Sequence, residues 1–106
     1  MEDSEFNRLA DTALTCIETA IDESGSDADF HRSGNVLEIE FDNGHKIIIN
    51  RHDINREIWV AAPSGGFHYA YQDGAWTSRR DESELYARLK ELFAEQGEAI
   101  HFNALS

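Results

Sequence analysis

Five carboxylates lie within twelve residues of this chain, in the stretch ETAIDESGSDAD from Glu18 to Asp29, and no Lys or Arg accompanies them. Like charges this close repel one another and lower the stability of the folded state. Glu18 and Asp22 are one helical turn apart, so a helix would place both on one surface. Carboxylate oxygens suit iron, manganese, magnesium and calcium. The stretch therefore indicates a weak, open cation site or a docking face for a basic partner, with a merely solvated surface as the simpler alternative.

A second pair of acids extends this surface. In VLEIEF, residues 36–41, the apolar residues alternate with Glu38 and Glu40, which puts both carboxylates on the outward face of a strand. If this strand lies beside the first helix, the two sets of acids form one ridge. The spacing does not match an EF-hand loop, so a tight calcium site is not expected.

Trp59 is the other residue whose position indicates a function. In EIWVAA, residues 57–62, the alternation buries Ile58 and Val60 and turns Trp59 outward. A large aromatic side chain on an open sheet face often marks a contact surface. Asn50, Arg51 and Arg56 are close in sequence and could share that surface, although partial covering of Trp59 by neighbouring strands is an alternative.

The remaining reactive residues form no catalytic constellation. The five histidines have no zinc-site spacing, and Cys16 is the single cysteine. The serines lack a nucleophile elbow, and the glycine pair at 65–66 is a turn rather than a phosphate loop. A non-enzymatic binding protein is therefore predicted. Iron oxidation or storage is the enzymatic alternative, and it would need a defined two-metal site.

Charge narrows the range of partners. The 106 residues include 9 basic and 21 acidic ones, a net charge of −12. Nucleic acid and anionic membranes would be repelled, whereas a cation or a basic protein surface would be attracted. The acidic start, MEDSEFNR, does not resemble a secretory signal, and no apolar run is long enough to span a bilayer. With one cysteine, a cytoplasmic location is expected.

The elements that position these residues can be read from the apolar spacing. Spacings of three and four predict a helix from Ser4 to Glu23 and a second one that begins near 81–83 and ends at Gly97. Residues 28–32 could lead into a strand. Strands are predicted at 36–41, 45–51, 57–62, 67–71 and 75–79, with a tight turn at 42–44. Ile100, Phe102 and Leu105 are expected to pack back onto the helices.

This order predicts one domain over residues 1–106, of the α+β class. It would be a two-layer sandwich in which the N- and C-terminal helices pack on one face of an antiparallel sheet of about five to six strands. The other face of the sheet would meet solvent.

Three stretches of the chain resemble one known family. NRHDINREIWVAAPSGGFHYAYQDGAW at 50–76, DSEFNRLAD at 3–11 and NGHKIIINR at 43–51 are similar to the frataxins, in particular to their bacterial branch, the CyaY family. The resemblance covers nearly the whole chain and implies the frataxin-like fold. It also implies a protein that binds ferrous and ferric iron weakly and modulates iron–sulfur cluster assembly. The implied partners are the cysteine desulfurase and the iron–sulfur scaffold protein, and the implied state is mostly monomeric, with iron-dependent oligomers as an option.

The resemblance also assigns residues. Bacterial relatives often carry an acid where this chain has Thr19, which is one departure from the family pattern. The implied metal-binding ridge maps onto Asp3, Asp11, Glu18, Asp22, Glu23, Asp27, Asp29, Glu38 and Glu40. The implied partner-binding residues are Glu18, Asp22 and Glu23 on the ridge and Asn50, Arg51 and Trp59 on the sheet. Without a specific metal role, the chain would be an acidic protein-interaction module.

Overall fold

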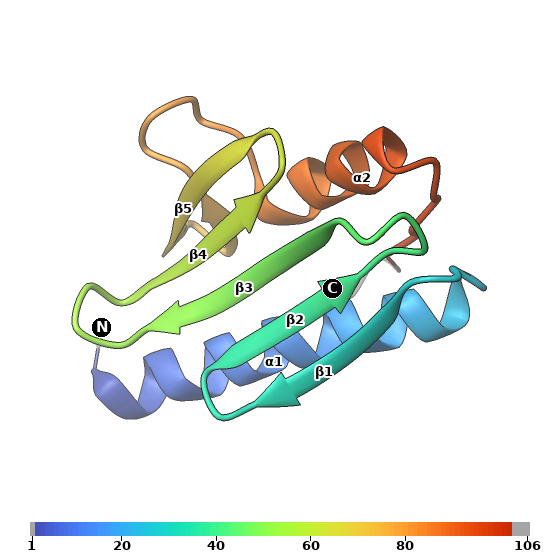
Figure 1. Cartoon of the computed structure of the whole chain (residues 1–106). Coiled ribbons are helices and arrows are strands. Elements are labelled where there is room, and N and C mark those ends of the chain that lie inside the picture. Colours follow the sequence, from blue (N-terminus) through green and yellow to red (C-terminus); the bar gives the residue numbers. More distant parts are fainter. Residues whose placement is uncertain (1, 103–106) are drawn as a thin grey trace.

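The computed structural model describes residues 2–102 and contains two helices and six strands (Figure 1). In chain order the elements are α1 (Asp3–Glu23), β1 (Asp29–Ser33), β2 (Val36–Glu40), β3 (Lys46–His52), β4 (Glu57–Ala62), β5 (Gly65–Gln72), β6 (Ala75–Thr77) and α2 (Leu85–Glu95). The predicted elements are all present, and each bound agrees with the expectation to within a few residues. The segment at 28–32, which the sequence left open, is the edge strand β1.

The sheet is an antiparallel meander in which every strand pairs with its neighbours in sequence. The turn at 42–44 joins β2 to β3, and Gly44 adopts a φ of +86°, which a glycine tolerates without strain. Both helices lie on the same face of this sheet, so the predicted two-layer α+β architecture is confirmed (Figure 1).

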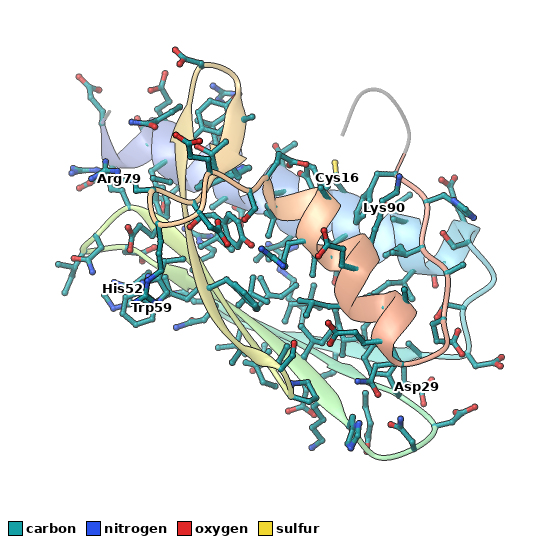
Figure 2. The ribbon with its side chains drawn as sticks, turned by 90° about the horizontal axis from the view of Figure 1, so that it is seen from above. Cys16, Asp29, His52, Trp59, Arg79 and Lys90 are labelled. Atoms are coloured by element: carbon teal, nitrogen blue, oxygen red, sulfur yellow. The ribbon has the colours of Figure 1, made fainter. Side chains whose placement is uncertain are left out.

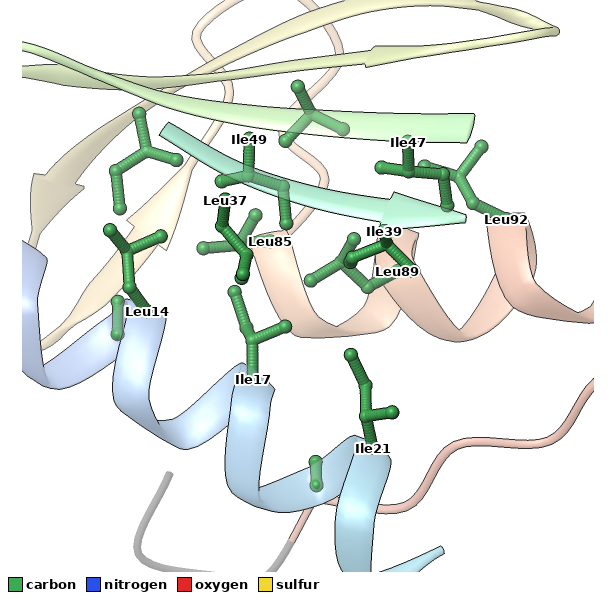
Figure 3. Close-up of a cluster of buried hydrophobic side chains, with 14 of the residues drawn as sticks. Leu14, Ile17, Ile21, Leu37, Ile39, Ile47, Ile49, Leu85, Leu89 and Leu92 are labelled. Carbon is green, nitrogen blue, oxygen red and sulfur yellow. The ribbon is translucent and has the colours of Figure 1, made fainter. Parts of the chain in front are cut away.

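The core lies between the helices and the sheet. Helix α1 contributes Leu14, Ile17 and Ile21, because residues spaced by three and four share one helical face (Figure 3). Alternate residues of β2 and β3 and the apolar side of α2 meet them from the other directions, and they include Leu37, Ile39, Ile47, Ile49, Leu85, Leu89 and Leu92. These side chains are essentially inaccessible to water, so the hydrophobic effect holds the two layers together.

The chain after α2 returns to the core as expected. Gly97 ends the helix with a φ of +76°, and Ile100 is buried. The ring of Phe102 packs on Tyr86 at a centroid distance of 4.7 Å. Leu105, the third apolar residue of the predicted packing, lies outside the described residues.

Candidate functional site

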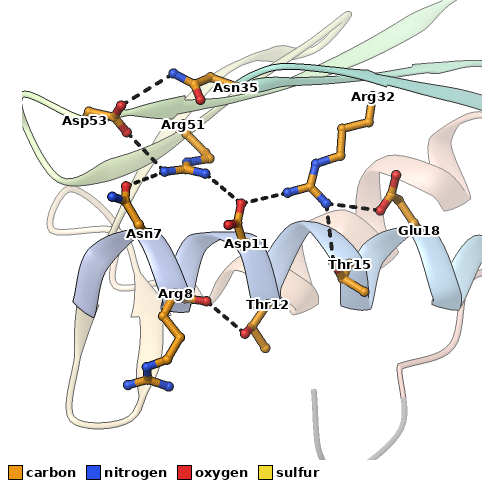
Figure 4. A network of polar contacts seen from close by, with 10 residues as sticks. All are labelled: Asn7, Arg8, Asp11, Thr12, Thr15, Glu18, Arg32, Asn35, Arg51 and Asp53. Carbon is orange, nitrogen blue, oxygen red and sulfur yellow. Dashed lines mark hydrogen bonds and ion pairs between the residues drawn. The ribbon is translucent and has the colours of Figure 1, made fainter. Parts of the chain in front are cut away.

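The first part of the predicted ridge is neutralised by arginines. Asp11 Oδ1 accepts from Arg32 Nη2 at 2.8 Å and from Arg51 Nη1 at 2.6 Å, and Arg32 Nη1 also lies 3.3 Å from Glu18 Oε1 (Figure 4). The two arginines come from β1 and β3, so this network ties α1 to two strands. A carboxylate held between two guanidinium groups is a poor candidate for binding a free cation, because its charge is already compensated.

Two more of the predicted ligands are paired. Asp3 Oδ1 lies 2.6 Å from Arg56 Nη2, and Glu38 Oε2 lies 3.4 Å from Lys46 Nζ. Both pairs are exposed, so each contributes little to stability. Four predicted metal ligands, Asp3, Asp11, Glu18 and Glu38, therefore have a basic partner.

The other five predicted ligands form no ion pair within residues 2–102. They surround the C-terminal end of α1 and the paired ends of β1 and β2, and they are Asp22, Glu23, Asp27, Asp29 and Glu40. All five are exposed, and Asp29 stands directly opposite Glu40 in the antiparallel register. The negative end of the helix dipole adds to the negative potential there, and the last turn of α1 contains no basic residue that would offset it. We call these five residues the open acidic cluster.

The expectation of a single continuous ridge is wrong in its geometry. The strand β1, and not the strand with Glu38 and Glu40, occupies the sheet edge beside α1 (Figure 1). Glu38 and Glu40 lie on the outer face of β2, with Asp29 beside them, whereas Glu18 and Arg32 meet on the helix side of the sheet. Alternation along β1 separates the two groups, because Arg32 and Asp29 point to opposite faces. The acids therefore form two surfaces that join at the end of α1.

In the part of the chain that the structure describes, no three His, Cys, Asp or Glu side chains converge in an arrangement that could hold a metal ion. The donors of the open acidic cluster are thus arranged as a charged surface rather than as a closed coordination shell. Such a surface can attract hard cations and basic proteins over a distance of about one Debye length, roughly 10 Å at 0.1 M salt.

The open acidic cluster should also destabilise the fold. We expect the double change Asp22→Asn and Glu23→Gln to raise the free energy of unfolding by about 1 kcal/mol at low ionic strength, because it removes repulsion and an unfavourable helix-dipole contact. Thermal unfolding at low salt and again in 1 M NaCl measures this, and the gain should shrink as salt screens the charges. Asp11→Asn is the matched control, and it should lower stability instead, because Asp11 bridges two arginines. A lower melting temperature for the double variant would contradict the crowding argument.

The second predicted surface is the outer face of the sheet around Trp59. The indole points away from the core, as the alternation predicts, and Asn50 stands directly opposite it on β3. Its ring is sandwiched between the imidazoles of His52 and His68, with centroid distances of 3.9 Å and 4.2 Å and interplanar angles of 12° and 7°. Trp59 Nε1 donates to Glu57 Oε1 at 2.8 Å. The ring is therefore fixed in place and half-covered by two neighbours that are not part of the core.

Arg51 does not lie on this surface, and its expected placement beside Trp59 is wrong. It alternates with Asn50 along β3, so its side chain points to the helix layer. There it donates to Asp11 and to Asn7 Oδ1, and it packs over the ring of Phe6 at 5.8 Å (Figure 4). With a side-chain exposure of 10 %, Arg51 is a structural tie between β3 and α1.

Three residues of these surfaces were not singled out from the sequence. Arg32 follows the acidic stretch by three residues, and its strand places it against α1. His52 and His68 looked like ordinary surface histidines. The antiparallel register gives the missing signal, since Trp59 pairs directly with His68, and His52 lies two residues from Asn50, the other direct partner.

A frataxin-like domain profile matches residues 1–99 of the chain. Two relatives are each named iron–sulfur cluster assembly protein CyaY. The protein from Chromobacterium violaceum is 53% identical over 103 residues, which cover 96% of this chain and 98% of the relative. The protein from Paraburkholderia xenovorans is 46% identical over 105 residues, which cover 98% of this chain and all of the relative.

Solved structures agree with the sequence comparisons. The frataxin from Psychromonas ingrahamii superposes with a TM-score of 0.90 at 38% identity, covering 97% of this chain and 99% of that structure. Yeast frataxin, at 23% identity and a TM-score of 0.60, shares the fold. No helix within the described residues is long and apolar enough to cross a membrane. With the matched profile, the near-complete coverage by CyaY relatives and the same arrangement of helices and sheet, this chain belongs to the frataxin family, in its bacterial CyaY branch.

Proposed function

We propose that this chain is an iron-binding protein that modulates iron–sulfur cluster assembly. In this proposal residues 1–106 form one frataxin-like domain in the cytoplasm that binds and docks but catalyses no reaction. Its partners are the cysteine desulfurase and the iron–sulfur scaffold protein. Ferrous or ferric iron is a weakly bound cargo or signal rather than a resident cofactor.

The open acidic cluster is the observation that carries this proposal. Five exposed carboxylates without a basic partner among residues 2–102 are a costly arrangement in a small domain, which has a modest margin of stability. The relatives named above are iron–sulfur cluster assembly proteins. Iron binding and desulfurase docking both need a concentrated negative potential on an accessible surface, and the cluster supplies it.

The donor chemistry fits a weak iron site. Carboxylate oxygens suit hard cations such as Fe³⁺ and also bind Fe²⁺. The opposed pair of Asp29 and Glu40 on neighbouring strands offers donors close to one another, and Asp22 and Glu23 extend the surface onto α1. Among residues 2–102 no side chain closes a coordination shell around them, which favours rapid exchange over tight retention. A cargo that must be released needs this property.

The docking role uses both surfaces. Basic groups of the desulfurase would meet Asp22 and Glu23, with Glu18 at the margin because Arg32 already binds it. The scaffold would meet the sheet face at Asn50 and Trp59. Charge complementarity of this kind raises the association rate and orients the partner.

The test is an anaerobic amide NMR titration with Fe²⁺ in a background of excess Mg²⁺. We expect selective broadening of the amides from Glu18 to Asp29 and at Glu40, and smaller effects at the ion-paired Asp3 and Glu38. The double variant Asp22→Asn and Glu23→Gln should lose most of that broadening.

The matched control removes the same charge elsewhere. Glu5→Gln with Glu95→Gln changes two exposed acids outside the open acidic cluster and should leave the broadening at Glu18 to Asp29 intact. If Mg²⁺ abolishes every selective effect in the unmodified protein, the iron role fails. The chain would then be an acidic protein-interaction module.

A further inference from the structure

The outer sheet face around Trp59 holds a stack of three aromatic rings. The rings of His52, Trp59 and His68 come from β3, β4 and β5 and stack face to face on the side of the sheet opposite the helices, so that both faces of the indole are covered. We call this stack the Trp59 platform. Figure 2 labels His52 and Trp59 together, and it labels Arg79 apart from them, nearer to the level of α1. The chain as a whole has a net charge of −12.

A pocket of about 420 Å³ opens beside the platform. His68 belongs to both features, since it stacks on Trp59 and also lines the pocket. Phe67 and Ser78 contribute to the wall, and the guanidinium-bearing residues Arg79 and Arg80 lie at the pocket as well. The platform and the pocket, which is lined by two arginines and two acids, are thus continuous through His68.

The acids and the arginines of this pocket differ in whether they already have a partner. Its two acids already have partners: Glu57 accepts from Trp59 Nε1, and Asp81 pairs with Arg88 at 2.9 Å. Hydrogen bonds from Ser83 hold the pKa of Asp81 down to about 2, so it stays ionised and occupied. Arg79 and Arg80 are exposed and form no ion pair with any residue from 2 to 102.

We propose that this surface binds a short acidic segment of a protein partner, with the segment's carboxylates in the pocket at Arg79 and Arg80 and an apolar side chain on the Trp59 platform. This inference rests on the proposed function, because it specifies the chemistry of the partner that binds the sheet face in that proposal. Guanidinium groups bind carboxylates through paired hydrogen bonds, and Trp and Arg supply much of the binding energy at protein interfaces.

The occupant is a short protein segment rather than a nucleic acid. A nucleic acid is a long polyanion, so it would extend past the pocket and meet the acidic remainder of the molecule. A loop or tail with a few carboxylates can bind at Arg79 and Arg80 alone, and it extends less over the acidic remainder of the molecule. The protein would then have two docking surfaces of opposite sign: the open acidic cluster for basic groups and the Trp59 face for acidic ones.

The probe for the test is the peptide Ac-EELEE-amide, titrated into the full chain at low ionic strength and followed by two-dimensional ¹⁵N NMR. We expect millimolar binding, with shifts confined to the amides of β4, β5 and residues 78–81 and to the Trp59 indole N–H. The isosteric peptide Ac-QQLQQ-amide should produce no such shifts. The variant Arg79→Ala with Arg80→Ala should raise the dissociation constant about fivefold or more, a change that corresponds to roughly 1 kcal/mol.

The matched control removes the same charge from distant sites. Arg8→Ala with Lys90→Ala changes two exposed bases on the helices and should alter the dissociation constant less than twofold. Equal losses in both double variants would mean that only net charge matters and would overturn the proposal. Absence of localised shifts at about 10 mM peptide would overturn it as well.

A separate measurement distinguishes this inference from the proposed function. Binding of the chain and of Trp59→Ala to the desulfurase–scaffold complex tests whether the sheet face docks at all. If Trp59→Ala weakens that binding while Arg79→Ala with Arg80→Ala does not, the docking face stands and the acidic-segment inference fails. If neither variant changes it, the docking role proposed for the sheet face fails.

Discussion

Replacing Trp76 by alanine is expected to lower the free energy of unfolding by about 3–5 kcal/mol, a large share of the 5–15 kcal/mol typical of a domain. The side chain is 3 % exposed, and its ring contacts Phe6 and Tyr71 edge-on at 6.1 Å and 5.3 Å. Truncation leaves a large cavity between α1 and the β5–β6 hairpin, and the surrounding rings cannot fill it. Chemical denaturation followed by far-ultraviolet circular dichroism measures the loss.

Trp59→Ala is the matched control, because it removes the same side chain from the outer face. We expect a cost of about 1–2 kcal/mol, from the two imidazole stacks and the hydrogen bond to Glu57. For partner binding we expect the opposite order, because Trp59→Ala should lower the affinity strongly and Trp76→Ala should lower it less in the folded protein. If Trp59→Ala unfolds the protein, the platform is part of the stabilising core and its role as a docking surface loses its basis.

The two tryptophans illustrate what the sequence could predict. Alternation in EIWVAA turned Trp59 outward and placed Ile58 and Val60 inside, and the structure confirms both. The apolar spacing of α1 likewise predicted its buried face through Leu14, Ile17 and Ile21. These predictions succeed because burial follows a local period of two or 3.6 residues, which neighbouring residues reveal without knowledge of the fold.

The charged surfaces were harder to predict, because their partners come from distant parts of the chain. The stretch from Glu18 to Asp29 contains no base, yet Arg32 from β1 reaches Glu18 and Asp11, and Arg51 from β3 reaches Asp11 as well. Which acids remain free depends on how strands pack against α1, and charge counts along the sequence do not contain that information. The short strand β1 was equally decisive, since its position at the sheet edge separates Glu38 and Glu40 from the helix.

The Trp59 platform depends on register in the same way. His52 and His68 are separated from Trp59 by seven and nine positions in sequence, and only the pairing of β3, β4 and β5 brings all three rings into contact. Alternation of side chains across the antiparallel sheet thus places the Trp59 platform on the outer face and the Arg51 network on the helix side.

Arg51→Ala is expected to lower the free energy of unfolding by about 2–3 kcal/mol, because it removes charged hydrogen bonds and the packing of the side-chain stem at once. The guanidinium binds Asp11 and Asn7 on α1, lies 3.5 Å from Asp53 and covers Phe6. Urea denaturation of the variant measures the effect. A double-mutant cycle with Asp11→Asn should give a favourable coupling energy, since Asp11 Oδ1 lies 2.6 Å from Arg51 Nη1.

Arg56→Ala is the matched control for this last prediction. Its guanidinium contacts Asp3 at the same distance of 2.6 Å, but the side chains of Arg56 and Asp3 are 43% and 83% exposed. Water and salt screen such a pair, so we expect a change within about 0.5 kcal/mol. Equal effects of Arg51→Ala and Arg56→Ala would show that burial does not strengthen the Arg51 network. If Arg51→Ala left the stability unchanged but weakened partner binding, Arg51 would belong to the docking surface. Its position against α1 would then not be its main role.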